Sequence, residues 1–126
     1  MQDRKVERWK DRAVEGESKI KILNTFAYTG MSTLVASHPH TEVCHVDGAK
    51  SSISWGKENA ALSGKSDNTI RWICDDVVGF MEREVRRGNK YDAIILDPPA
   101  FGRGAKKTWK IEKDIYHLMD LVAQLL

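Results

Sequence analysis

Short apolar runs alternate along the chain with longer segments in which apolar residues recur at helical spacing. The runs around 20–23 and at 42–46, 69–74 and 91–96 are rich in branched apolar residues, as buried strands are. The segments that follow them carry the apolar stripe of amphipathic helices, at 31–37, 49–63, 77–87 and 114–126. Strands that alternate with helices form parallel sheets with right-handed crossovers and helices on both faces. The pattern therefore predicts an α/β doubly wound, Rossmann-like parallel sheet of about four strands.

The same pattern predicts which side chains are buried. Segment 91–96 is so apolar that both of its faces should be covered. Cys74 is expected to be a small core residue, and Glu84 is expected to face water. Segment 77–87 should turn inward the apolar residues Val77, Phe80, Met81 and Val85. The last segment should bury Ile115, Leu118, Met119, Val122, Leu125 and Leu126.

The first strand runs into a loop of mostly small residues before the first helix begins. Gly30 in this loop can adopt a positive φ, and the helix after it directs free backbone N–H groups towards the loop. Open α/β sheets bind their ligands at this carboxyl end of the strands. The loop therefore predicts a cradle for a polar ligand, although a glycine after a strand is a weak signal by itself.

Acidic residues end the later strands. Asp47 lies close to the position, about 20 residues after a glycine loop, at which mononucleotide-binding folds place a carboxylate for ribose hydroxyls. Asp75 and Asp76 end the third strand, where a ligand amino group such as that of adenine would offset the crowded negative charge. Each of these aspartates could instead cap the helix that follows it. The spacing of Asp47 favours the ligand role, and for Asp75 or Asp76 both roles can hold together. The fourth strand ends in Asp97-Pro98-Pro99, in which the prolines fix φ and remove backbone donors.

The composition is that of one ordinary globular domain. The chain has 126 residues, of which 41% are hydrophobic and 30% are charged. It has no apolar run of the roughly 18–20 residues that a membrane span needs, and its charged N-terminus has no signal-peptide core. Cys44 and Cys74 are far apart and lack a metal-binding spacing. We therefore expect a cytoplasmic protein with two free thiols, no metal and no membrane partner.

Five motifs occur in an order that resembles class I S-adenosylmethionine-dependent methyltransferases. They are Phe26-Ala27-Tyr28-Thr29-Gly30, Val46-Asp47-Gly48-Ala49-Lys50-Ser51, Lys57-Glu58-Asn59-Ala60, Arg71-Trp72-Ile73-Cys74-Asp75-Asp76 and Leu96-Asp97-Pro98-Pro99-Ala100-Phe101-Gly102-Arg103-Gly104. The most similar branch comprises bacterial enzymes related to ribosomal RNA cytosine-C5 methyltransferases. The resemblance implies a cofactor-binding core over residues 20–126. The charge and the helical spacing of apolar residues in segment 1–19 predict a charged helix or arm before it.

The resemblance also implies a role for each motif in binding S-adenosyl-L-methionine. The first loop would hold the methionine part of the cofactor through residues that include Asn24, Phe26, Tyr28, Thr29 and Gly30. Asp47 would accept hydrogen bonds from the ribose hydroxyls, with Gly48 and Ala49 beneath the adenosine. Asp76, helped by Asp75, would receive the adenine amino group beside the backbone of Val77.

The candidate catalytic residues are those after the fourth strand. Asp97, Pro98 and Pro99 would form the wall at which the substrate base meets the sulfonium, and Phe101 would offer a flat surface to a splayed-out RNA base. In amino-group methyltransferases an aromatic residue follows the second proline directly, whereas Ala100 intervenes here. The resemblance therefore implies methyl transfer to RNA, at a ring carbon of a pyrimidine base.

One departure from the family leads to an alternative function. Carbon-methylating relatives use a cysteine after the next strand, and this chain stops at Leu126, before that strand. We therefore also consider a catalytically incomplete cofactor-binding or interaction module, truncated before a fifth strand. The fourth strand would then be an exposed apolar edge, which predicts a homodimer through this edge or through the C-terminal helix.

A basic cluster surrounds Trp109 near the end of the chain. Its members are Arg103, Lys106, Lys107, Lys110 and Lys113. Basic residues interleaved with an aromatic residue can follow a phosphate backbone and stack a base. A solvated loop explains the same residues equally well, so both interpretations stay open here.

Overall fold

The computed structural model describes residues 19–103 and 107–126, so almost all of the predicted N-terminal arm (1–19) lies outside the described residues. Along the described chain the elements are β1 (Ile20–Thr25), α2 (Met31–Ala36), β2 (Thr41–Asp47), α3 (Lys50–Leu62), β3 (Thr69–Cys74), α4 (Val77–Arg86), β4 (Ala93–Leu96), β5 (Phe101–Arg103), β6 (Thr108–Lys110) and α5 (Ile111–Leu125). No helix in these residues is long and apolar enough to cross a membrane.

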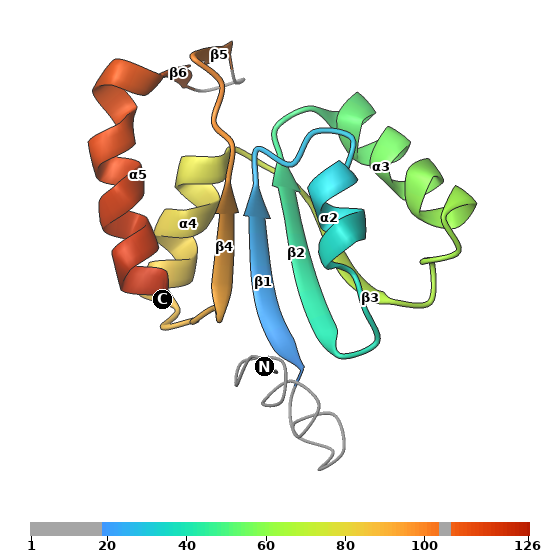
Figure 1. Cartoon of the computed structure of the whole chain (residues 1–126). Helices are drawn as coiled ribbons and strands as arrows, with labels where there is room; N and C mark the ends of the chain where they lie inside the picture. The colour runs from blue at the N-terminus through green and yellow to red at the C-terminus, as the bar shows by residue number, and fades with distance from the viewer. Residues whose placement is uncertain (1–18, 104–106) are drawn as a thin grey trace, which may run out of the picture.

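The first four strands form one parallel sheet in the order β3-β2-β1-β4. Figure 1 shows α2 and α3 against one face of this sheet and α4 and α5 against the other. The predicted α/β doubly wound sheet is therefore confirmed. In the described sheet β4 pairs only with β1 and lies at one edge, while β3 lies at the other edge.

Side chains alternate between the two helical layers because successive residues of a strand point to opposite faces. Leu23, Cys44 and Val46 join the larger core, together with buried residues of α4 and α5. Ile22 and Val43 point the other way and pack with Ala36 of α2. Both faces of the central strands are thus fixed, which holds their carboxyl ends in a constant position.

Four residues have a burial that differs from the prediction. Glu84 is buried, because the hydroxyl of Tyr91 and the side-chain amide of Asn89 both donate hydrogen bonds to its carboxylate, at 2.5 and 2.6 Å. Cys74, the last residue of an edge strand, is exposed. Met119 and Leu126 are also exposed, whereas Leu118, Leu121, Val122 and Leu125 form the inner face of α5.

The sequence pattern also missed a small hairpin. β5 and β6 pair in antiparallel fashion, with Phe101 opposite Lys110. Each strand has only three residues, too few for an alternating pattern to be recognised. The hairpin lies above the carboxyl end of β4 in Figure 1, so it brings the residues before α5 to the side of the sheet where the predicted site is found.

Candidate cofactor and substrate site

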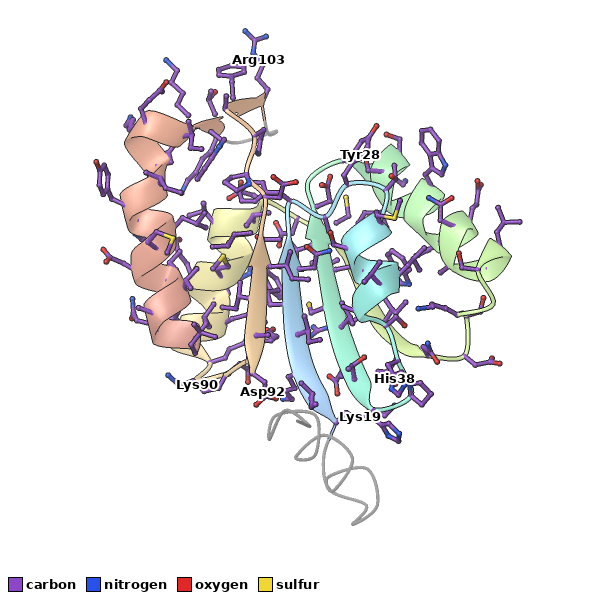
Figure 2. The ribbon with its side chains drawn as sticks, in the orientation of Figure 1. Lys19, Tyr28, His38, Lys90, Asp92 and Arg103 are labelled. Carbon is purple, nitrogen blue, oxygen red and sulfur yellow. The ribbon has the colours of Figure 1, made fainter. Side chains whose placement is uncertain are left out.

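The predicted site residues lie where the four parallel strands end. Thr25 at the end of β1 is opposite Val46 of β2 and Leu96 of β4, and Asp47 is opposite Cys74 at the end of β3. The loop after β1, the aspartates after β3 and the turn after β4 therefore emerge from one edge of the sheet. Figure 2 shows Tyr28 and Arg103 at this end of the molecule, and Lys90 and Asp92 at the opposite end.

The loop after β1 has an unusual backbone. Gly30 adopts φ 94°, as predicted, but Phe26 and Tyr28 also have positive φ, at 48° and 50°. A non-glycine residue in this region costs about 1–3 kcal/mol and persists only where its surroundings impose it. Here the imposing contacts include hydrogen bonds from the Ala27 amide to the Val46 carbonyl at 3.1 Å and from the Asn59 side chain to the Thr29 carbonyl at 3.0 Å.

Asp47 connects the loops that follow β1 and β2. Its Oδ2 accepts a hydrogen bond from the Tyr28 amide and its Oδ1 accepts one from the Ala49 amide, both at 2.9 Å. A carboxylate offers about four lone-pair positions, so two amide donors leave it able to accept from further hydroxyls. Because Asp47 also holds Tyr28 in its strained conformation, one side chain shapes the loop and presents acceptors beside it.

The two aspartates after β3 have different partners. Asp76 caps α4, since its Oδ2 accepts a hydrogen bond from the Gly79 amide at 2.9 Å, and Val77 is the buried first residue of that helix. Asp75 forms an ion pair with Arg83 and accepts the Asp76 amide at 2.8 Å. Asp75 also lies next to the loop that contains Gly48, because its amide donates to the Asp47 carbonyl at 3.0 Å.

The Asp97-Pro98-Pro99 turn is held by residues that come later in the chain. The indole N–H of Trp109 donates to the Pro99 carbonyl at 2.7 Å, and the Ile111 amide donates to the Ala100 carbonyl at 3.0 Å. The ring of Trp109 also lies 5.2 Å, centroid to centroid, from Phe26 in the first loop. Trp109 thus bridges the loop after β1 and the turn after β4.

This position excludes one interpretation of the basic cluster. Trp109 is 9% exposed, so its ring is not available to stack an RNA base. The sequence pattern alone predicts a surface aromatic at Trp109, because only the hairpin shows that the chain folds back onto Pro99. Arg103, Lys107, Lys110 and Lys113 are exposed, and Lys106 lies outside the described residues.

The remaining candidates differ in exposure. Phe101 on β5 is 53% exposed and Tyr28 is 63% exposed, so both aromatic side chains can be reached from solvent. Asn24 is 2% exposed, and its side-chain amide donates to the Thr33 hydroxyl at 2.9 Å. Its side chain is therefore directed into the layer between the sheet and α2, beneath the loop.

Both cysteines lie away from the turn after β4. Cys44 is buried against α4, and burial raises the pKa of its thiol to about 11. Cys74 ends β3, and two strands separate β3 from β4. Among the described residues, neither thiol is beside Asp97.

The family of the chain follows from comparison with known proteins. Residues 1–126 match the family model described as S-adenosylmethionine-dependent methyltransferase. A crystal structure of a SAM-dependent methyltransferase from Agrobacterium tumefaciens is 41% identical and superimposes with a TM-score of 0.83, covering 97% of this chain and 40% of that one. The chain belongs to the S-adenosylmethionine-dependent methyltransferase family, which confirms the fold, the resemblance and the predicted cofactor.

Curated relatives add information about the branch. A ribosomal RNA large subunit methyltransferase K/L from Syntrophotalea carbinolica is 36% identical over 116 residues, which are 89% of this chain and 15% of that protein. A ribosomal RNA large subunit methyltransferase I from Aeromonas salmonicida is 33% identical over 82 residues, 64% of this chain and 21% of that protein. The chain thus spans only a small part of the length of these relatives.

Proposed function

We propose that the chain binds S-adenosyl-L-methionine at the carboxyl edge of its sheet and acts in methyl transfer to RNA. The observation that carries the proposal is the position of Asp47, which joins the strained loop after β1 to the start of α3. An acidic residue at the end of the second strand, beside a loop with positive φ values, provides the acceptors that ribose hydroxyls need. RNA is supported as the substrate because the curated relatives are ribosomal RNA large subunit methyltransferases.

In this proposal the cofactor lies across the ends of the central strands. The backbone of the loop, with Phe26, Tyr28, Thr29 and Gly30, holds the methionine part, and Asn24 supports the loop from below. Asp47 accepts the ribose hydroxyls above Gly48 and Ala49. Asp76, with Asp75 and the Val77 backbone, faces the adenine. The chemistry of these groups fits the ligand, because carboxylates attract its ammonium and sulfonium charges and accept hydrogen bonds from its hydroxyl and amino groups.

The bound cofactor would supply an activated methyl group on a cationic sulfur, so the first task of the chain is to align the acceptor. Transfer to a ring carbon also releases, as a proton, the hydrogen that the methyl group replaces. Well-oriented reactants can save about 7–11 kcal/mol of a barrier. The Asp97-Pro98-Pro99 turn is suited to this task, since two prolines and the Trp109 and Ile111 hydrogen bonds keep it rigid. Phe101, exposed beside the turn, offers its ring to the base.

We further propose a pyrimidine ring carbon as the acceptor, on the basis of the Pro99-Ala100-Phe101 order. The alternative is a cofactor-binding module that performs no transfer by itself. One observation favours it: neither Cys44 nor Cys74 is placed to attack a base beside Asp97. A tritiated-methyl assay separates the two functions, with ribosomal RNA as substrate and nucleoside digestion to identify the product.

The outcome of that assay is specific. The enzyme is supported if tritium is transferred to a pyrimidine nucleoside and this transfer is lost in Asp97→Ala. The transfer should be retained in Trp55→Phe, a control at an exposed residue of α3. Cofactor binding without transfer supports the module. Transfer to an exocyclic amino group would overturn the ring-carbon assignment.

The proposal includes a cytoplasmic location and self-association. β4 lies at an edge of the described sheet, and α5 exposes Tyr116 and Met119, at 76% and 47%. Exposed strand edges and apolar patches favour pairing between copies. A monomer at high protein concentration in sedimentation equilibrium would contradict this part of the proposal.

A further inference from the structure

A buried chain of polar side chains runs beneath the cofactor loop. Asn24 of β1, Thr33 of α2 and His45 of β2 are 2%, 0% and 0% exposed. The Asn24 amide lies 2.9 Å from the Thr33 hydroxyl, which lies 2.8 Å from Nδ1 of His45. Asn24 and His45 are direct partners in the parallel ladder, so they point to the same face of the sheet. This chain of hydrogen bonds therefore ties α2 to both central strands.

The first of these hydrogen bonds has a fixed direction, because the Asn24 amide nitrogen can only donate and the Thr33 oxygen accepts from it. The direction of the second depends on the tautomer of His45, because the Thr33 oxygen has a second lone pair that a protonated Nδ1 could use. We assign the Thr33 hydroxyl as the donor and Nδ1 of His45 as the acceptor. A neutral imidazole that accepts at Nδ1 carries its proton on Nε2. Nε2 is the one buried side-chain nitrogen or oxygen in the described residues without a hydrogen bond of normal geometry. Burial lowers the pKa of the His45 ring, and the Tyr28 backbone lies close enough to the ring to oppose part of this shift.

The histidine ring also supports the loop directly. A Cβ placed on Gly30 would lie 3.6 Å from Cε1 of His45 and 3.7 Å from the Cα of Gly56. On the side of β3, the ring of Trp72 packs against His45 with centroids 4.6 Å apart. The imidazole thus lies between Gly30 and Trp72, with its Nδ1 edge held by Thr33. A buried polar ring without a hydrogen bond of normal geometry at Nε2 costs stability that a leucine would not cost.

We propose that His45 is a positioning residue for the cofactor loop, acting through Thr33 and Gly30. The loop must hold Phe26 and Tyr28 at positive φ, and Asp47 can bond the Tyr28 amide only while the backbone keeps this course. His45 supports the loop at Gly30 and fixes the first turn of α2 at Thr33. It therefore holds the end of the cofactor loop in a fixed position relative to α2. The inference rests on the proposed cofactor site for its effect on affinity, but its effect on the loop itself needs no ligand.

The test compares variants that alter the chain of hydrogen bonds with one that does not. His45→Leu removes the acceptor at similar volume, Thr33→Val removes the hydroxyl, and Thr33→Ser restores it. Val43→Ala is the matched control, because Val43 is fully buried on the same strand and the same face, two residues before His45. Hydrogen exchange of the Ala27, Tyr28 and Gly30 amides, each hydrogen-bonded in the loop, is measured by NMR without ligand.

We expect His45→Leu and Thr33→Val each to speed exchange of these loop amides by about tenfold relative to the Leu23 amide in β1, as the loss of one buried hydrogen bond would. Thr33→Ser should stay near wild type, and Val43→Ala should change loop and strand amides by the same factor. In calorimetric titration, the variants whose loop amides exchange faster should also bind S-adenosylhomocysteine more weakly. Nitrogen-15 NMR should place the His45 proton on Nε2.

Each contrary result has a distinct meaning. A uniform change of exchange in His45→Leu, like that in Val43→Ala, would make His45 an ordinary core residue and overturn the inference. A proton on Nδ1 would overturn the hydrogen-bond directions. The loop amides could exchange as expected in a chain that does not bind S-adenosylhomocysteine. This result would overturn the proposed function but would agree with the role of His45 in supporting the loop.

Discussion

Trp109 offers the sharpest test of how the substrate wall is held. Trp109→Phe removes the indole N–H that donates to the Pro99 carbonyl at 2.7 Å, but keeps an aromatic ring beside Phe26. The lost hydrogen bond should cost about 0.5–1.5 kcal/mol. The smaller ring at a site that is 9% exposed should cost roughly another 1 kcal/mol. We therefore expect the free energy of unfolding to fall by about 1–3 kcal/mol.

The local effect is what distinguishes a positioning role from general packing. The Ile111 amide donates to the Ala100 carbonyl, so its hydrogen exchange reports on opening of the turn. In Trp109→Phe this exchange should accelerate by about tenfold more than that of the Leu23 amide in the core of the sheet. Trp55→Phe, at a tryptophan that is 57% exposed, is the control and should change neither. Equal acceleration at Ile111 and Leu23 would refute the idea that Trp109 holds the turn.

Three further changes test other parts of the structure. Asp76→Ala should lower the free energy of unfolding, measured by urea titration, by about 1 kcal/mol. Asp76→Asn keeps a capping oxygen, so it should lose only cofactor affinity. Equal stability of the two variants would contradict the capping role of Asp76. Burial lowers the pKa of His45 from 6.5 to about 4, so on acidification the unfolded chain takes up the proton before the folded chain does. The free energy of unfolding should therefore be unaffected by this residue above pH 6.5 and should fall by about 2 kcal/mol by pH 5. His45→Leu should abolish this pH dependence. Burial raises the pKa of Cys44 from 9.0 to about 11, so stability should fall as pH rises above 9, and Cys44→Ala should remove that part of the loss.

The sequence was sufficient for the alternation of parallel strands with helices and for the edge at which the site lies, but not for the order of the strands in the sheet. The segment 69–74 predicted the bounds of β3 correctly, because its branched and aromatic residues favour a strand and Asp75 follows them. The aspartates at strand ends could be placed together because parallel strands end at a common edge. The cap of α4 by Asp76 was one of two stated alternatives for that residue.

The contacts between distant segments could not be predicted. The positive φ values of Phe26 and Tyr28 run against the intrinsic preference of aromatic residues and depend on Asp47, which the chain reaches only after α2 and β2. The burial of Trp109 against Pro99 could be predicted only with knowledge of the β5–β6 hairpin. Glu84 lies on the buried stripe of α4 by spacing, but its charge argued for water until Tyr91 and Asn89 were seen to satisfy it.

The proposed cofactor site is the edge of the sheet formed by the first loop and Asp47. Isothermal titration of the intact chain with S-adenosylhomocysteine tests it most directly, with Asp47→Ala as the variant and Val43→Ala as the control for stability. The account predicts saturable binding by the wild-type chain and by Val43→Ala, and a loss of at least about tenfold in affinity in Asp47→Ala. No binding by the intact chain, or equal binding by Asp47→Ala, would contradict it.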